Sequence, residues 1–240
     1  LAALVGALSF AIPGWVAMIG QREGVTTFKL SRAAYGTHGN KIPNFMAWLN
    51  MVGWLSVNVI TGTLLFSAML KTINIPKNEF TTAICLIIFA GLVIVSGVFK
   101  EDTLAKIQTW LSWIFGVLTL VILIIFLYNA NWAEAVNMKS GHWLTGWLPA
   151  IAFIAAGSSI SWSMAAADWG AYVRPKTRPA ATFWNTTLGA ATPLFVLMAG
   201  GILLSTIEPS LATSGNPYDV MYKAIPSWFG FTYFLIAAGG

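Results

Sequence analysis

Tryptophan and asparagine side chains that could bind a planar ring share one face of an apolar segment. Trp54 and Asn58 are four residues apart, and Asn50 lies one helical turn earlier on the same face. An aromatic ring offers a stacking surface, and an amide can hydrogen-bond to the edge of a heterocycle. Amides inside a membrane span need a partner. This stripe therefore predicts either a hydrogen bond to a neighbouring helix or contact with a polar ligand.

A second set of candidate groups lies in the middle of the apolar segment 149–174. The set consists of small, hydroxyl and aromatic residues: Gly157, Ser158, Ser159, Ser161 and Trp162. Lipid tolerates irregular backbone only where protein or a polar cavity surrounds it. Transporters bind their substrates at interrupted helices of this kind. We therefore expect an unwound stretch that offers hydroxyl and backbone groups to a substrate.

The titratable residues argue against an enzyme or a metal centre. Asp168 is the strong candidate for a charge near the end of an apolar segment, and no His or Lys lies at depth to form an acid–base pair with it. His38 and His142 fall in loops without a second ligand at metal spacing, and Cys85 lies in an apolar segment. We expect no catalytic residue, no bound metal and no cofactor.

The composition indicates an all-α polytopic membrane protein that carries these groups. Apolar residues make up 57% of the chain and charged residues 9%, against roughly 45 to 50% and about 25% in soluble domains. Seven segments are long enough to cross a bilayer. They are 1–20, 43–70, 80–99, 107–128, 148–172, 183–207 and 224 to the end. We expect residues 1–240 to be a single transporter domain and an internal fragment of a longer protein, because the chain opens inside an apolar run.

The distribution of Lys and Arg predicts the orientation. Loops 21–42, 100–106 and 174–182 hold nine of the 13 basic residues, namely Arg22, Lys29, Arg32, Lys41, Lys100, Lys106, Arg174, Lys176 and Arg178. The positive-inside rule places these loops in the cytoplasm of a multi-pass protein of the plasma membrane. The formal charge of +5 then reflects topology, and we expect a lipid bilayer rather than nucleic acid as the surrounding partner.

Two separated motifs resemble a known family. The first cytoplasmic loop reads GVTT at residues 24–27 and RAAYGTHG at residues 32–39, and GW follows at residues 53–54. Residues 157–161 followed by Asp168 and Arg174 resemble an interrupted sixth helix and its end. Together they are similar to the purine, cytosine, uracil, thiamine and allantoin permeases, the first nucleobase-cation symporter family, and are close to its cytosine branch.

The resemblance covers helices two to eight of the family and implies its five-plus-five inverted-repeat, LeuT-like fold. In that fold the first and sixth helices are unwound at mid-membrane and the substrate sits between them. The resemblance further implies a substrate imported by alternating access and a coupling ion, either Na+ or H+. The ion-binding first helix would precede this chain, and the eighth would be cut at Gly240.

The site residues of the family carry over unevenly. Trp54 matches the tryptophan that stacks on the substrate, and Asn58 matches a polar contact position of some members. Ser159 stands where many members place a second aromatic residue, so Trp162 either replaces that residue or packs against a neighbour. Met51 stands where some cytosine-type members have glutamine, so recognition of the ring edge differs from theirs.

The charged pair at the end of the sixth helix is expected to act in structure or gating. Asp168 and Arg174 are six residues apart and therefore lie on different faces of a helix. We expect Asp168 to pair with a basic residue of the loop that holds Arg32, or else to be a solvated charge at the interface.

The leading interpretation is a symporter for a nucleobase or related heterocycle, with no obligate protein partner evident. The alternative is an amino-acid or other small-solute symporter of the same fold.

Overall fold

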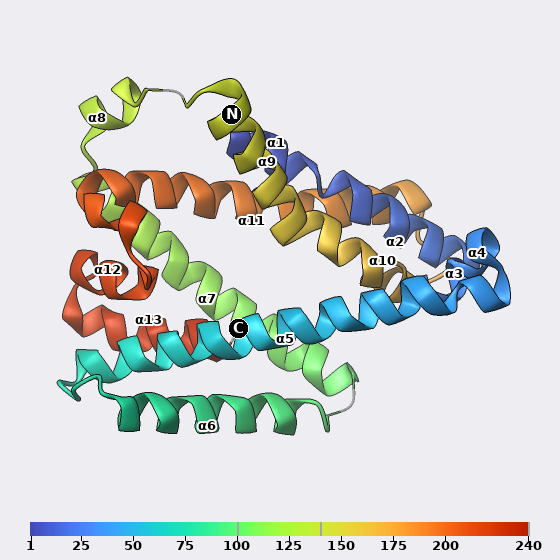
Figure 1. Cartoon of the computed structure of the whole chain (residues 1–240), viewed down its shortest axis with the longest axis horizontal. Helices are drawn as coiled ribbons and strands as arrows, with labels where there is room; N and C mark the ends of the chain where they lie inside the picture. Colours follow the sequence, from blue (N-terminus) through green and yellow to red (C-terminus); the bar gives the residue numbers. More distant parts are fainter. Residues whose placement is uncertain (100, 140, 240) are drawn as a thin grey trace. The chain divides into compact units, whose positions relative to one another are not determined.

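The computed structural model describes residues 1–99, 101–139 and 141–239, and every regular element in these ranges is a helix (Figure 1). Within these ranges, six helical stretches are long and apolar enough to cross a membrane, which confirms the all-α polytopic class. They are Ala2–Glu23, Lys41–Thr72, Glu79–Ser96, Lys106–Asn129, Trp143–Ala171 and Pro179–Ile207. Lys100, at the start of one predicted cytoplasmic loop, lies outside the described residues.

The seventh predicted span corresponds to a shorter helix. Helix α13 (Ser227–Gly239) has 13 residues, and its apolar part is Trp228–Ala237. At 1.5 Å per residue a helix of this length spans roughly 20 Å, less than the roughly 30 Å of a hydrocarbon core. Within the described residues, six of the seven predicted segments therefore reach spanning length, and the last is a shorter apolar helix.

The chain folds into two compact units. The first contains Leu1–Val52 and Met138–Ala199, and the second contains Gly53–Asn137 and Gly200–Gly240. Two long helices, α5 (Lys41–Thr72) and α11 (Pro179–Ile207), contribute residues to both units.

Close packing of small residues holds the first unit together. Helix α2 (Ala11–Glu23) packs along α10 (Ser161–Ala171). A Cβ placed on Gly20 would stand 2.3 Å from the backbone oxygen of Ala167, and one on Gly170 would stand 2.0 Å from that of Ala17. Such close approach between backbones is what small residues permit in membrane helices.

Shorter helices complete the first unit. Helix α1 (Ala2–Leu8) packs on α9 (Leu148–Ile154), which follows the π-helix η1 (Trp143–Trp147). Helix α2 ends at Gly24, whose φ of 63° is the left-handed conformation that glycine adopts without strain. Helices α3 (Thr27–Leu30) and α4 (Arg32–Gly39) then form the first predicted cytoplasmic loop.

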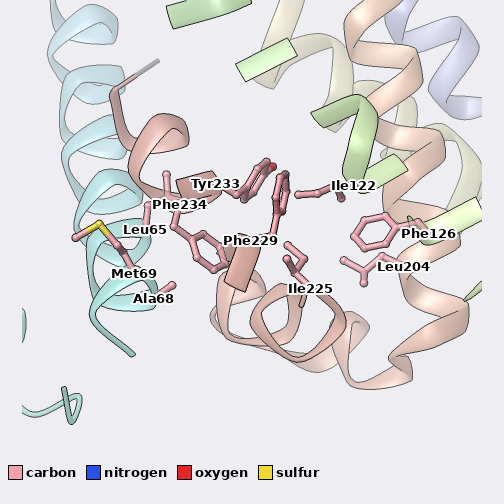
Figure 2. Close-up of a cluster of buried hydrophobic side chains, with 10 residues drawn as sticks. All are labelled: Leu65, Ala68, Met69, Ile122, Phe126, Leu204, Ile225, Phe229, Tyr233 and Phe234. Carbon is pink, nitrogen blue, oxygen red and sulfur yellow. The ribbon is translucent and has the colours of Figure 1, made fainter. Parts of the chain in front are cut away.

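An aromatic core holds the second unit together. Side chains of α5, α7 (Glu101–Asn129), α11 and α13 gather around Phe229, Tyr233 and Phe234 (Figure 2). Phe234 is fully buried, and the ring of Tyr233 stacks on Phe115 with the centroids 5.7 Å apart. Aromatic residues therefore give the short helix α13 a large buried area.

The remaining helices of the second unit have recognisable start signals. Helix α6 (Glu79–Ser96) begins with a capping box, in which Asn78 and Thr81 each satisfy the other's backbone N–H. Helix α12 (Pro217–Ala224) has Asn216 as its N-cap and proline at its first position. Helix α8 (Trp132–Asn137) follows α7, and the 3-10 helix η3 (Pro209–Thr213) follows α11.

Candidate substrate-binding site

The two predicted ring-binding residues of α5 belong to the second unit. Trp54 is half-buried and Asn58, one turn later, is exposed. The other predicted substrate contacts, Gly157 to Trp162, belong to the first unit. Each set is therefore described separately, and their joint contact with a substrate stays a prediction.

The interruption of the sixth-helix segment is a π-helix rather than the unwound stretch predicted from its composition. The π-helix η2 (Ala155–Ile160) joins α9 to α10, and the residues at its ends keep right-handed helical angles. A π-turn bonds each N–H to the carbonyl five residues earlier, so it adds a residue without leaving the backbone open. This satisfies the requirement of lipid for internally bonded backbone, which unwinding would not.

The serine hydroxyls of this segment bond back to the helix. The Ser158 hydroxyl donates to the carbonyl of Ile154, and the Ser161 hydroxyl donates to that of Ala156. Apart from its chain neighbours and its own helix backbone, no described atom lies within 4 Å of the place where a Cβ on Gly157 would stand. Gly157, Ser158 and Ser161 are all partly exposed. The turn therefore presents a small polar surface.

Ser159 differs from its neighbours because it points into the first unit. Its side chain is 0% exposed, and its hydroxyl contacts both the carbonyl of Ala155 and the hydroxyl of Ser9. Trp162 has the opposite environment, with 57% of its surface exposed. Its role as a substitute aromatic residue stays a prediction.

Asp168 is bound by a threonine of the first predicted cytoplasmic loop and not by the basic residue that was expected. Its Oδ2 accepts from the backbone N–H of Thr27 at 3.0 Å and from the Thr27 hydroxyl at 2.7 Å. The Thr27 hydroxyl in turn accepts from the backbone N–H of Ala167. The prediction that Asp168 contacts this loop is therefore confirmed, but the expected basic partner is wrong. The backbone N–H and the hydroxyl of Thr27 at the start of α3 bond to the carboxylate instead.

The two predicted gating arginines form no ion pair within the described ranges. Ion pairs there join Asp219 to Lys71 and Lys77, whereas Arg32 and Arg174 have no carboxylate within reach. Arg174 takes part through its backbone, since its carbonyl accepts from Gln21 Nε2 at 3.5 Å.

Two amide side chains that sequence reasoning missed hold this end of the first unit. Gln21 donates to the carbonyl of Thr177 at 2.8 Å and accepts from the hydroxyl of Thr182, so it ties α2 to the loop before α11 and to the first turn of α11. Asn40 is 2% exposed; it donates to the carbonyl of Phe28 and accepts from the Ser31 hydroxyl. Their positions at the ends of polar loop segments gave no signal of burial.

In the second unit, charged side chains tie α12 to the end of α5. Asp219 lies 3.4 Å from Lys71 Nζ and 3.3 Å from Lys77 Nζ. Partial burial raises the pKa of Asp219, but the positive charges of Lys77 and Lys71 outweigh this effect and hold the pKa below its ordinary value. Burial also raises the pKa of Tyr218, which precedes Asp219 on α12.

Comparisons with known proteins agree with the resemblance of the motifs. The chain is 25% identical over 235 residues to the purine-cytosine permease FCY21 of Saccharomyces cerevisiae, covering 96% of this chain and 41% of the relative. It is 27% identical over 191 residues to the purine-cytosine permease FCY2 of the same yeast, covering 77% of this chain and 34% of that relative.

The chain therefore spans less than half the length of either relative. No solved structure gives a significant match. The family described as "Permease for cytosine/purines, uracil, thiamine, allantoin" matches residues 1–240, and the chain belongs to that family.

Proposed function

We propose that the protein imports a nucleobase or a related planar heterocycle across the plasma membrane by alternating access, with Na+ or H+ as the coupling ion. The family match along residues 1–240 carries this proposal, because it includes every helix in which we place a substrate contact. Both yeast relatives are named as purine-cytosine permeases. This favours a heterocycle over the amino-acid alternative.

The chemistry of α5 supports the substrate class. Trp54 supplies an indole face, and Asn58 supplies both donor and acceptor groups one turn away. Stacking of a base on an aromatic side chain contributes roughly 1 to 3 kcal/mol in nucleic-acid complexes. We assign Trp54 to stacking and Asn58 to the ring edge.

The chemistry of the π-turn supports a second group of contacts. Gly157 offers backbone without a side chain, while Ser158, Ser161 and Trp162 are at least partly exposed. Ser159 has a supporting role in this proposal, because its buried hydroxyl is already bonded within the first unit. We further propose that Asp168 and Thr27 hold the first cytoplasmic loop against α10 during gating.

The test is uptake by the full-length protein in proteoliposomes. Radiolabelled adenine, cytosine, uracil, hydantoin and a panel of amino acids are offered with a Na+ gradient, with a proton gradient and with neither. The proposal expects concentrative uptake of at least one heterocycle driven by one of the gradients. Uptake of amino acids alone, or heterocycle uptake that neither gradient accelerates, would contradict it.

A further inference from the structure

Ser9 occupies a break in the first membrane-spanning stretch. Helix α1 ends at Leu8 and α2 begins at Ala11, and the residues between them tighten the turn. The backbone N–H of Phe10 bonds to the carbonyl of Ala7, and that of Ile12 bonds to the carbonyl of Ser9, each three residues earlier. The helix is therefore wound more tightly here than an α-helix.

This tightened turn contacts the widened turn of the partner helix. The hydroxyl of Ser9 meets the hydroxyl of Ser159 in the π-helix η2, and both α1 and α2 contact η2. Ser159 is fully buried, so no solvent competes for this contact. Around Ser9 the backbone bonds reach three residues back, whereas in η2 they reach five residues back. The two serines join these irregular turns.

Counting protons shows that the two hydroxyls must share their bonds. Ser9 also contacts the carbonyl of Gly6, and Ser159 also contacts that of Ala155 at 3.2 Å. Two hydroxyl protons thus face three oxygen contacts, and each hydroxyl can donate only once. Either Ser159 donates to Ser9 and Ser9 to Gly6, or Ser9 donates to Ser159 and Ser159 to Ala155, and each of these arrangements places one bond across the helices. If each serine donated to its own helix instead, the two hydroxyl oxygens would be in contact with no proton between them, which is repulsive.

The helices on either side of this contact are already fixed to each other. Gly6 lets α1 approach α9 so closely that an added Cβ would stand 2.3 Å from Ile154 Cγ2. Beyond the contact, α2 and α10 are packed through the small residues Gly20 and Gly170. Residues 9–10 join α1 to α2, and η2 joins α9 to α10. These two turns lie between the packed helix pairs, and the Ser9–Ser159 bond links one turn to the other.

We infer that Ser9 is a positioning residue for the substrate site: its bond to Ser159 holds the π-turn in register. A π-turn adds one residue to a helix, and shifting it along the chain by one position rotates each side chain it passes by about 100°. Ser158, Ser161 and Trp162 keep their present directions only while the turn stays in place. This inference rests on the proposed function, because these are the side chains assigned to substrate.

The first test measures equilibrium binding to the full-length protein. The probe is whichever of radiolabelled adenine, cytosine and uracil the wild type binds most tightly. Ser9→Ala is expected to weaken binding about three- to tenfold, the effect of losing one hydrogen bond. Ser9→Thr, which keeps the hydroxyl, is expected to restore most of the affinity. Ser9→Ala/Ser159→Ala should bind no more weakly than the weaker of the two single variants, because both remove the same bond.

A matched control separates the cross-helix bond from the local one. Ser205 also donates to the carbonyl three residues earlier, that of Ile202, but within its own helix. Ser205→Ala is expected to bind as the wild type does. Wild-type affinity in Ser9→Ala, or losses that multiply in the double variant, would overturn the inference.

The second test needs no substrate, so it distinguishes this inference from failure of the proposed function. Hydrogen exchange of the substrate-free protein is followed at the amides of residues 155–161 and of residues 166–170. Ser9→Ala is expected to speed exchange in the first group and leave the second unchanged. Unchanged exchange in both groups, or faster exchange in both, would overturn the positioning role. A wild type that binds none of adenine, cytosine, uracil and hydantoin would contradict the proposed function and would leave the exchange result for Ser9→Ala unaffected.

Discussion

The carboxylate of Asp219 joins two lysines from different parts of the second unit. Lys71 lies at the end of α5, and its Nζ also stands 5.1 Å from the centre of the Tyr222 ring. Lys77 lies in the loop that precedes α6. All three charged groups are partly exposed, so each ion pair stabilises the fold only modestly. The two ion pairs connect α12 to the end of α5 and to the loop before α6.

The depressed pKa of Asp219 predicts a pH dependence. The charged form is favoured in the folded protein, so its stabilising contribution is complete above the ordinary pKa of about 4 and is lost as the pH falls through the lower, folded-state value. Asp219→Asn should lower the free energy of unfolding by about 0.2 to 1 kcal/mol at pH 6.

The measurement compares wild type and Asp219→Asn in denaturant at several pH values. The difference between them should shrink as the pH is lowered from 5 toward 3. A difference that stays constant or grows at low pH would mean that the ion pairs do not control the stability of this loop. Glu208→Gln is a suitable control, because Glu208 has no ion pair among the described residues.

Asp168, unlike Asp219, accepts hydrogen bonds from an uncharged residue. Its two bonds from Thr27 fasten the start of α3 to the end of α10, and Gln21 and Asn40 fasten neighbouring parts of the same end. Hydrogen bonds to a charged acceptor typically contribute about 1.5 to 3 kcal/mol. This end of the first unit is therefore held by directional polar bonds in addition to apolar packing.

At the scale of elements, the crossing of α2 and α10 depends on the absence of side chains at two positions. Gly170→Ala would place a methyl group 2.0 Å from the backbone oxygen of Ala17, which cannot rotate away. Overpacking of this kind costs about 1 to 3 kcal/mol. The variant should therefore lower the melting temperature of the detergent-solubilised protein.

Gly116→Ala provides the matched control. Gly116 also lies within a long helix, but apart from its chain neighbours and its own helix backbone no described atom comes within 4 Å of its added Cβ. Because alanine favours helix more than glycine, this variant should melt at the same temperature or slightly higher. Equal melting of the Gly170 and Gly116 variants would show that the close crossing does not hold the first unit together.

Much of the arrangement of helices was predictable from the sequence. The first six apolar segments appear as helices within a few residues of the predicted bounds, because a long apolar run has few alternatives in lipid. The sequence predicted the position of the irregular stretch at residues 155–160 correctly, but it did not predict that the stretch is a π-helix. Small and hydroxyl residues signal a deviation from the α-helix without specifying whether the backbone unwinds or widens.

The polar contacts were less predictable for a physical reason. Thr27, Gln21, Asn40 and Ser9 each bond to groups distant in the sequence or across a loop, and such residues are common on exposed surfaces. Their roles depend on which helices are adjacent. Asp168 was singled out because charge is rare in this chain, yet its partner was a hydroxyl and a backbone N–H, which no charge pattern reveals.

At the scale of the whole molecule, the chain is a multi-pass protein of the plasma membrane in the cytosine and purine permease family. Among the residues that the structure describes, six helices are long and apolar enough to span a membrane. The two groups of proposed substrate contacts divide between the two compact units, with Trp54 and Asn58 in one and residues 157–162 in the other. Among these proposed contacts, Trp54 is the one expected to contribute most to substrate recognition, because it offers the stacking surface.

The most direct test is nucleobase binding by Trp54→Ala in the full-length protein, with Trp48→Ala as control. Trp48 lies on the same helix, is exposed and stacks on Phe45. Loss of a stacking ring worth roughly 1 to 3 kcal/mol corresponds to weakening of binding by about five- to 150-fold. We predict that loss in Trp54→Ala and wild-type affinity in Trp48→Ala. Wild-type affinity in a folded Trp54→Ala variant would contradict the account.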